Sequence, residues 1–426
     1  MSDSVLKETF KGEKASDLIP VLSYDEKANL YFLDDKTLAF AFRVYPLGGA
    51  DDTINSRINN FLSTDWPTNT TLQVSLYTSD NINPQMNGFL LKREGLAEPM
   101  YMRMSEVRAD FLHAATIRPT DPVSNAIVRN FNIVISVKLP IKEFEPSSDE
   151  YEKAVDLQIM TQKNLSTIGL NPTALHRDDY LIMMDEILHH GDDASWRDNF
   201  ARTADLDKPL NSQVLDWDKC IDVDDKGLWI GSQRVKTLGA KRYPEAVFPG
   251  FGVNYIGDIM TGTRGLKGQF LFNFTIIFPD AQKTRFTIDK KRTFTIAQAT
   301  GPLQKFVPVL QHKAKGFNLL NEALDDGDRP VKVYLSVSVF GKTDEQATEN
   351  ATNVRSYLSE LGFQMIADRY YVLPFFLNSL PFGADRQAVN DLFRYKTMAT
   401  RHAAVLMPLF ADWRGTGTPV LNYISR

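Results

Sequence analysis

The residues best suited to chemistry are Gly341-Lys342-Thr343, which follow an alternating apolar segment and precede a helical pattern. In a phosphate-binding loop, four residues between an earlier glycine and the Gly-Lys-Thr cradle the phosphates. Here Ser336 holds the position of the earlier glycine, and residues 337–340 continue the alternation of a strand. We therefore interpret the motif as a turn followed by a helix N-cap at Thr343 or Asp344, and expect no ATP hydrolysis by this chain.

Histidines and carboxylates offer a second candidate chemistry in the run 189–193, His-His-Gly-Asp-Asp. Neighbouring residues of a helix point about 100° apart, so adjacent histidines do not easily share one ion. We interpret the run as the end of a helix, where histidine complements the helix dipole. No G-x-S-x-G, H-E-x-x-H or G-x-G-x-x-G motif is present, and the glycine-rich segment 262–268 precedes a strand rather than a helix. The sequence thus predicts no catalytic, cofactor-binding or metal-binding residue.

A basic segment between Ala281 and Lys315 is the clearest charge feature. Its eight cations and one acid, Asp289, give +7, whereas the whole chain carries −5 and the remainder therefore −12. Such asymmetry indicates contact with an acidic partner or lipid surface, or else a solvated helical face. The candidate partner-binding residues are Lys283, Arg285, Lys290, Lys291, Arg292, Lys305, Lys313 and Lys315.

Hydrophobic periodicity predicts the elements that carry these residues. Alternation with period 2 predicts strands at 37–44, 72–76, 131–139, 270–278 and 331–339. Asp51 or Asp52, Ser147 or Ser148, and Thr343 or Asp344 are expected to cap helices, and further helices are expected at about 178–190 and 304–325. Segment 81–123 has a helical pattern interrupted by prolines, and segment 285–296 suits either a helix or a β-hairpin.

The order strand-helix-strand occurs in both halves of the chain. It predicts an α+β fold of two ferredoxin-like modules, with helices on one face of mixed sheets. The aromatic residues of strand 270–278 could stack bases on an exposed sheet, but polar residues on the other face favour core packing for them. The expected boundaries are a flexible N-terminus at 1–17, a first module at 18–240, a connecting segment at 241–268, a second module at 269–400 and a C-terminal segment at 401–426.

Composition is that of a soluble globular protein, with 43% hydrophobic and 24% charged residues. No run of 18 apolar residues could span a bilayer, and residues 1–14 lack the features of a signal peptide. The single cysteine, Cys220, excludes an intramolecular disulfide and is expected to be a small buried residue. These features predict a cytosolic, reduced protein.

Three segments carry a resemblance to a known family. They are residues 17–24 (DLIPVLSY), residues 373–382 (LPFFLNSLPF), and residues 404–413 (AVLMPLFADW) with 415–421 (GTGTPVL). Their order and spacing resemble those of the TraC-type conjugation ATPases of type IV secretion systems. In that family a phosphate-binding loop follows the last segment, whereas this sequence ends at Arg426, so no catalytic residue is carried over.

The resemblance implies a non-catalytic N-terminal region that docks a motor onto the secretion machine for pilus biogenesis and transfer of DNA or protein. Residues 401–426 would lead toward a RecA-like motor domain, absent here, that uses ATP and Mg²⁺. The implied partners are inner-membrane components, the chain's own motor domain and further copies in a hexamer, and the implied location is the bacterial cytoplasm, peripheral to the inner membrane. A nucleic-acid-binding module using segment 283–315 is the alternative, which the acidic remainder disfavours, and a self-contained enzyme is the weakest hypothesis.

Overall fold

The computed structural model describes residues 14–95, 98–119, 127–191, 194–198, 202–216, 219–257, 264–300, 309–391 and 393–411. The strands in chain order are β1 (Val21–Asp25), β2 (Leu30–Leu33), β3 (Thr37–Val44), β4 (Thr71–Ser79), β5 (Asn130–Pro140), β6 (Thr173–Ala174), β7 (Ile221–Val223), β8 (Leu228–Ile230), β9 (Gln233–Arg242), β10 (Phe270–Ile277), β11 (Pro330–Gly341), β12 (Gln364–Ala367) and β13 (Lys396–Ala399). The α-helices are α2 (Asp52–Leu62), α3 (Asn83–Leu91), α4 (Pro99–Ala115), α5 (Ser148–Ile168), α6 (Arg177–Leu188), α7 (Ala281–Thr300), α8 (Val309–Asp325), α9 (Asp344–Glu360), α10 (Val372–Ser379), α11 (Arg386–Asp391) and α12 (Thr400–Leu406).

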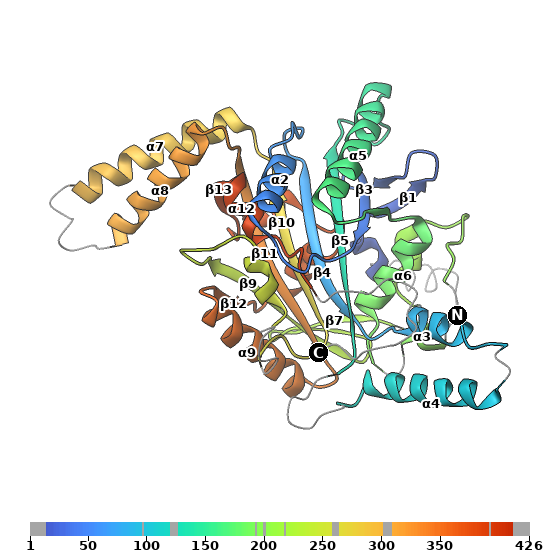
Figure 1. Ribbon diagram of the computed structural model, residues 1–426. Helices are drawn as coiled ribbons and strands as arrows, with labels where there is room; N and C mark the ends of the chain where they lie inside the picture. The colour runs from blue at the N-terminus through green and yellow to red at the C-terminus, as the bar shows by residue number, and fades with distance from the viewer. Residues whose placement is uncertain are drawn as a thin grey trace, which may run out of the picture.

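One antiparallel sheet runs through the molecule, with helices on both of its faces (Figure 1). Its order is β1-β2-β3-β5-β4-β10-β11-β9-β8-β7, with β6 beside β3, β12 beside β9 and β13 beside β11. The α+β class and the predicted strands are confirmed. The described strands form a single sheet rather than separate mixed sheets.

The two halves of the sheet share the same strand order. In the first half the order is β6-β3-β5-β4, and in the second it is β12-β9-β11-β10. A short antiparallel hairpin precedes each half, β1-β2 in one and β7-β8 in the other. The halves meet where β4 pairs with β10, from Tyr77 opposite Leu271 to Thr71 opposite Ile277. The predicted module boundary at 241–268 stays a prediction, and β9, from the first predicted range, pairs with strands of the second.

The first face of the sheet carries the main core. Alternate strand residues such as Phe42, Val74 and Phe272 are buried there beneath α2, α5 and α9. The predicted caps hold these helices, since Asp51 accepts a hydrogen bond from the Ile54 amide and Ser147 forms a capping box. The expectation that Phe270, Phe272 and Phe274 pack in the core is confirmed.

The second face is also covered, so the expectation of helices on one face only is wrong. Helix α6 contributes Tyr180 and Met184, and α10 with the turn after it contributes Phe376 and Phe382, to a second core. Polar strand residues lie beneath α10 and are hydrogen-bonded: Gln73 donates to the Asn378 carbonyl (3.0 Å). Helix α10 and the turn after it contain the family-like segment 373–382, which therefore covers part of the second face.

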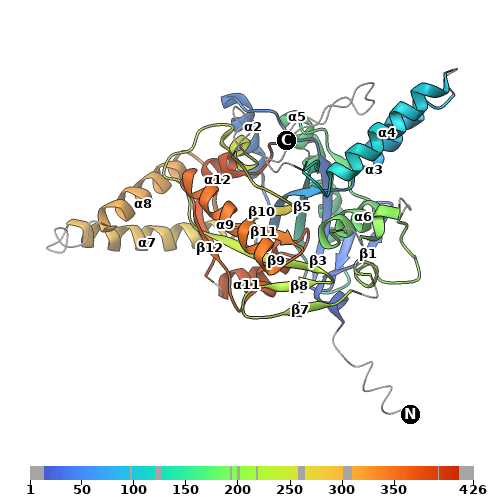
Figure 2. The ribbon, with the colours of Figure 1, turned by 90° about the horizontal axis from the view of Figure 1, so that it is seen from below.

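Each half of the sheet has a helical hairpin inserted between two of its strands, at the same place in the strand order. The pair α3 and α4 joins β4 to β5, and the pair α7 and α8 joins β10 to β11. Both pairs project away from the sheet, in different directions (Figure 2). The expected break in this helical segment is confirmed, because α3 and α4 are separate helices, and Pro84 and Pro99 lie in their first turns, where proline is tolerated. Segment 285–296, for which the sequence allowed a helix or a β-hairpin, lies within helix α7.

Two further expectations concern the ends of the sheet and of the chain. The expectation that Cys220 is buried is wrong, because this thiol is exposed beside the edge strand β7.

Helix α12, in the segment assigned to the start of a motor domain, contacts α2, and the Leu47 amide donates to the Leu409 carbonyl (2.9 Å). Residues 412–426 lie outside the described residues. None of the described helices has the length and apolarity needed to cross a membrane.

Candidate docking hairpin and the acidic cluster of helix α6

The helical hairpin α7/α8 presents the predicted basic residues. Asp280 starts α7 by accepting a hydrogen bond from the Lys283 amide (3.0 Å), which lowers the pKa of this carboxyl. Ile288 of α7 packs with Leu320 and Leu324 of α8, and Ala399 of β13 completes this small core. The hairpin is thus held together mainly by contacts between its two helices and is joined to the sheet at β13.

Two of the basic residues fasten the hairpin internally. Arg285 forms an ion pair with Asp325 at the end of α8. The Arg292 Nε donates to Asn318 Oδ1 across the two helices (3.0 Å). These two side chains therefore join α7 to α8, and their charge is partly used within the hairpin.

Lys290 faces solvent beside an exposed aromatic ring. The Lys290 Nζ lies 4.2 Å from the ring centre of Phe286, a cation–π distance. Phe286 and Phe294 are 60% and 65% exposed. Together with Asp289, Lys290 and Ala297 they border a shallow depression along α7. This face combines apolar rings with one lysine and one carboxylate.

The predicted partner-binding residues differ in whether a nearby carboxylate pairs with their charge. Lys283 forms a surface ion pair with Asp280 (3.5 Å). In the part of the chain that the structure describes, no carboxylate lies within 4.0 Å of the ammonium groups of Lys291, Lys313 or Lys315. Lys305 lies outside the described residues. The hairpin brings the other seven onto one projecting element, and whether they bind a partner stays a prediction.

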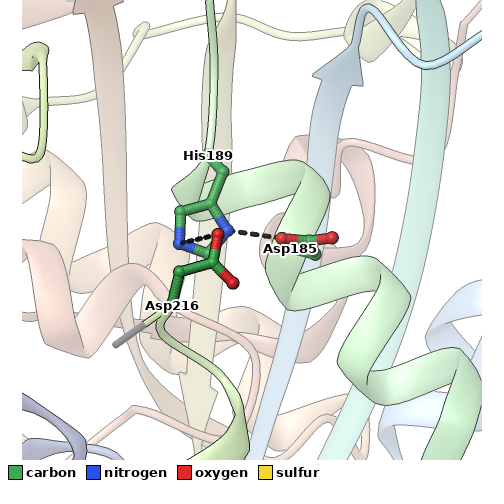
Figure 3. A group of neighbouring side chains, drawn as sticks. All are labelled: Asp185, His189 and Asp216. Carbon is green, nitrogen blue, oxygen red and sulfur yellow. Dashed lines mark hydrogen bonds and ion pairs between the residues drawn. The ribbon is translucent and has the colours of Figure 1, made fainter. Parts of the chain in front are cut away.

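A cluster that the sequence reasoning missed lies beside the C-terminal end of α6. His189 lies between Asp185 and Asp216, and one ligand atom from each residue lies within 4.8 Å of the others (Figure 3). The spacing of Asp185 and His189, four residues apart on a predicted helix, is the signal that could have been used. Asp216 comes from a distant loop, which sequence spacing does not place.

The cluster also contains a cation from the protein. Arg202 places one guanidinium nitrogen 2.7 Å from Asp185 Oδ1 and another 3.5 Å from Asp216 Oδ1. Burial opposes ionisation of Asp185, but the hydrogen bond from His189 and the charge of Arg202 hold its pKa below the usual value. The guanidinium thus occupies the position between the carboxylates that a bound cation would take. That the chain has no metal site stays a prediction.

The Gly-Lys-Thr motif forms the predicted turn and helix cap. Residues Ser336–Gly341 pair with β9 up to the last residue of β11, so they form no loop around a phosphate. Thr343 caps α9 by accepting a hydrogen bond from the Gln346 amide (3.2 Å). A Cβ on Gly341 would lie 2.6 Å from the Ala347 nitrogen, so close approach of strand and helix requires glycine here.

Comparisons with known proteins identify the family. A family model described as "TraC protein" matches residues 15–384. The chain belongs to the TraC family, so the suspected family is confirmed, and the matched range includes the first two of the three segments.

Protein TraC of Escherichia coli (strain K12) is 22% identical over an alignment of 413 residues, which covers 93% of this chain and 47% of that protein. The chain thus spans about half the length of this curated relative.

Proposed function

We propose that this chain is a docking and assembly region of a type IV secretion protein of the conjugation type. In this proposal it contacts inner-membrane components on the cytoplasmic side and serves pilus biogenesis and substrate transfer. Family membership supports the general role. ATP and Mg²⁺ would be used by a motor domain elsewhere in the whole protein, and further copies would assemble with it into a hexamer.

The observation that carries the docking proposal is the projecting hairpin α7/α8. Lys283, Lys290, Lys291, Lys313 and Lys315 are exposed on this hairpin, and Lys290 lies over the exposed ring of Phe286. An acidic amphipathic segment of a membrane component fits such a face, because its carboxylates can meet the lysines while its apolar residues cover the rings.

We test the proposal with charge removal at residues that do not hold the hairpin together. Lys291→Gln, Lys313→Gln and Lys315→Gln together should weaken binding to the solubilised inner-membrane components roughly tenfold, since each exposed pair contributes about 0.5 kcal/mol. The measurement is biolayer interferometry with purified components. Neutralising Lys290, Lys291 and Arg292 should also weaken binding, with some loss of hairpin stability from Arg292.

The matched control is Lys153→Gln with Lys163→Gln, two exposed lysines of α5. It should leave binding and melting temperature unchanged. Equal affinity of the hairpin variant and the wild type would refute the docking proposal.

The nucleic-acid alternative uses the same lysines and makes a different prediction. Binding of duplex DNA would fall steeply with rising salt concentration, because phosphate contacts release counterions. DNA binding that disappears in the hairpin variant, with docking unchanged, would favour the alternative.

We also propose that each half of the sheet is a ferredoxin-like module. The support is the order β-α-β-β-α-β with strand order 4-1-3-2, which β3, β4, β5 and β6 follow in the first half. The second half repeats the strand order, with a 3-10 helix at Phe251–Tyr255 in place of the first α-helix. Hydrogen exchange tests the short outer strands, since amides of β6 and β12 that bond to β3 and β9 should be protected. Exchange of both strands at the rate of a free peptide would contradict the four-stranded modules.

A further inference from the structure

We propose that helix α4 is a self-association surface, pairing antiparallel with α4 of a second copy of this chain. The helix lies on the projecting hairpin α3/α4 (Figure 2). Its inner face is buried through Ala109 and Leu112, which pack with Ile82 and Met86 at α3. The helix is therefore formed and held in place without the second copy.

The outer face of α4 carries an uncovered apolar stripe. Met100, Met104, Val107 and Phe111 are 65%, 59%, 62% and 49% exposed. Their spacings of 4, 3 and 4 residues are those of a heptad seam, and Ala114 continues the series. Helix α9 has the same spacing at Ala347, Ala351, Val354 and Leu358, and those four residues are buried against the sheet. On α4 the equivalent stripe faces outward.

Charges beside the stripe identify the occupant. When two copies of α4 run antiparallel with Met104 level with Val107, Met100 is level with Phe111. Arg103 of each copy then lies opposite Asp110 of the other, giving two reciprocal ion pairs in a twofold interface. In the same register Tyr101 lies opposite Arg108, an arrangement suited to cation–π contact.

Other arrangements fit the surface less well. In a parallel pair, Arg103 would face Arg108 of the other copy, and like charges oppose such pairing. An interfacial membrane helix is rich in lysine and arginine on its polar side. On α4, Arg103 and Arg108 are balanced by Glu106 and Asp110, so an anionic lipid surface gains no net attraction. A second copy satisfies both the stripe and its charges.

The interface would be small. A helix of 17 residues is about 25 Å long, and the paired stripes cover less than the roughly 1,600 Å² of a standard stable interface. We therefore expect reversible, concentration-dependent dimers, strengthened where copies are held close together by a larger assembly.

Charge reversal provides the decisive experiment, measured by sedimentation velocity of the full chain over a range of concentrations. Arg103→Asp should weaken dimerisation at least tenfold, because it sets two carboxylates against each other at both ion-pair positions. Asp110→Arg should weaken it similarly, since two guanidinium groups then meet at each position. The double variant R103D/D110R should restore dimerisation, because it recreates both ion pairs with reversed polarity.

Val107→Asp should abolish dimers, and Ile159→Asp on α5, at a partly exposed apolar residue, is the matched control. A wild-type chain that stays monomeric at every concentration would overturn the proposal. So would a double variant that remains as weak as the single ones. Binding to anionic vesicles that Val107→Asp removes, in a chain that forms no dimers, would assign the stripe to a membrane surface instead.

Discussion

At the scale of single residues, Asp368 is a carboxyl held under unusual conditions. It follows β12, its side chain is fully buried, and Arg394 donates to its Oδ1 (2.6 Å). The other oxygen, Oδ2, has no hydrogen-bond partner among the described residues. Burial raises the pKa of Asp368 to about 7, although the charge of Arg394 opposes the rise.

This raised pKa predicts how stability depends on pH. The folded state binds the proton of Asp368 more tightly than the unfolded state does, so protonation stabilises the fold. This stabilisation is fully present below the pKa of a carboxyl in the unfolded chain, and it is lost as pH rises through about 7. Asp368→Asn removes this dependence. We expect the variant to gain on the order of 2 kcal/mol relative to the wild type between pH 5 and pH 8, in free energies of unfolding from urea titrations.

Asp207→Asn, at an exposed loop position, controls for the substitution itself. If the stability difference between Asp368→Asn and the wild type were the same at pH 5 and pH 8, the Asp368 carboxyl would be ionised at both pH values. The raised pKa of Asp368 would then be wrong.

Residue-level chemistry was only partly predictable from the sequence. The Gly-Lys-Thr motif could be rejected because the strand pattern continues up to Gly341, and the structure agrees. The cluster around His189 could not be assembled, because Arg202 and Asp216 reach it from loops whose path depends on the whole fold. Local spacing predicts partners on one helix, but not partners brought by tertiary packing.

At the scale of elements, Thr343 distinguishes a helix cap from a phosphate site. Thr343→Ala should lower the free energy of unfolding by about 1 kcal/mol, because the Gln346 amide loses its acceptor. The measurement is urea unfolding monitored by circular dichroism. We also expect no ATP turnover in the wild type.

Lys342→Ala is the companion variant, because this lysine would contact phosphates in a nucleotide site but is not the cap. Turnover in the wild type that disappears in Lys342→Ala would contradict the interpretation of the motif as a cap.

Individual elements were more predictable than their surroundings. Period-2 alternation located the strands, but the polar residues between the apolar ones suggested a solvated second face. Asn273 and Thr275 are instead buried beneath α10, where Asn273 donates to the Thr275 hydroxyl (2.9 Å). A strand whose polar residues satisfy one another is indistinguishable, by pattern alone, from one that faces water. Segment 285–296 was ambiguous for a similar reason, since its threonines and phenylalanines suit a strand.

At the scale of the whole molecule, strand order could not be read from the sequence. The repeated order strand-helix-strand predicted two similar halves, and both have the same strand order. The direct pairing of β4 with β10 depends on contacts about 200 residues apart, for which the sequence carries no local signal. The halves consequently share one sheet and one main core.

This shared core leads to a prediction about cooperativity. Phe272 of β10 lies in the core that also contains Val74 of β4 and Ile135 of β5. Phe272→Ala should lower the free energy of unfolding by about 3–5 kcal/mol. Hydrogen exchange should show this loss equally in β4–β5 and in β10–β11, because the halves unfold together.

Leu320→Ala, in the small core that α7 and α8 form with Ala399 of β13, should reduce protection mainly in that hairpin while leaving β4–β5 unchanged. If Phe272→Ala instead lost protection only in β10–β11, the two halves would unfold independently. That result is expected of separate modules on either side of residues 241–268. The comparison therefore decides whether the repeated halves act as one folding unit, whose projecting hairpins can be altered without disturbing the sheet.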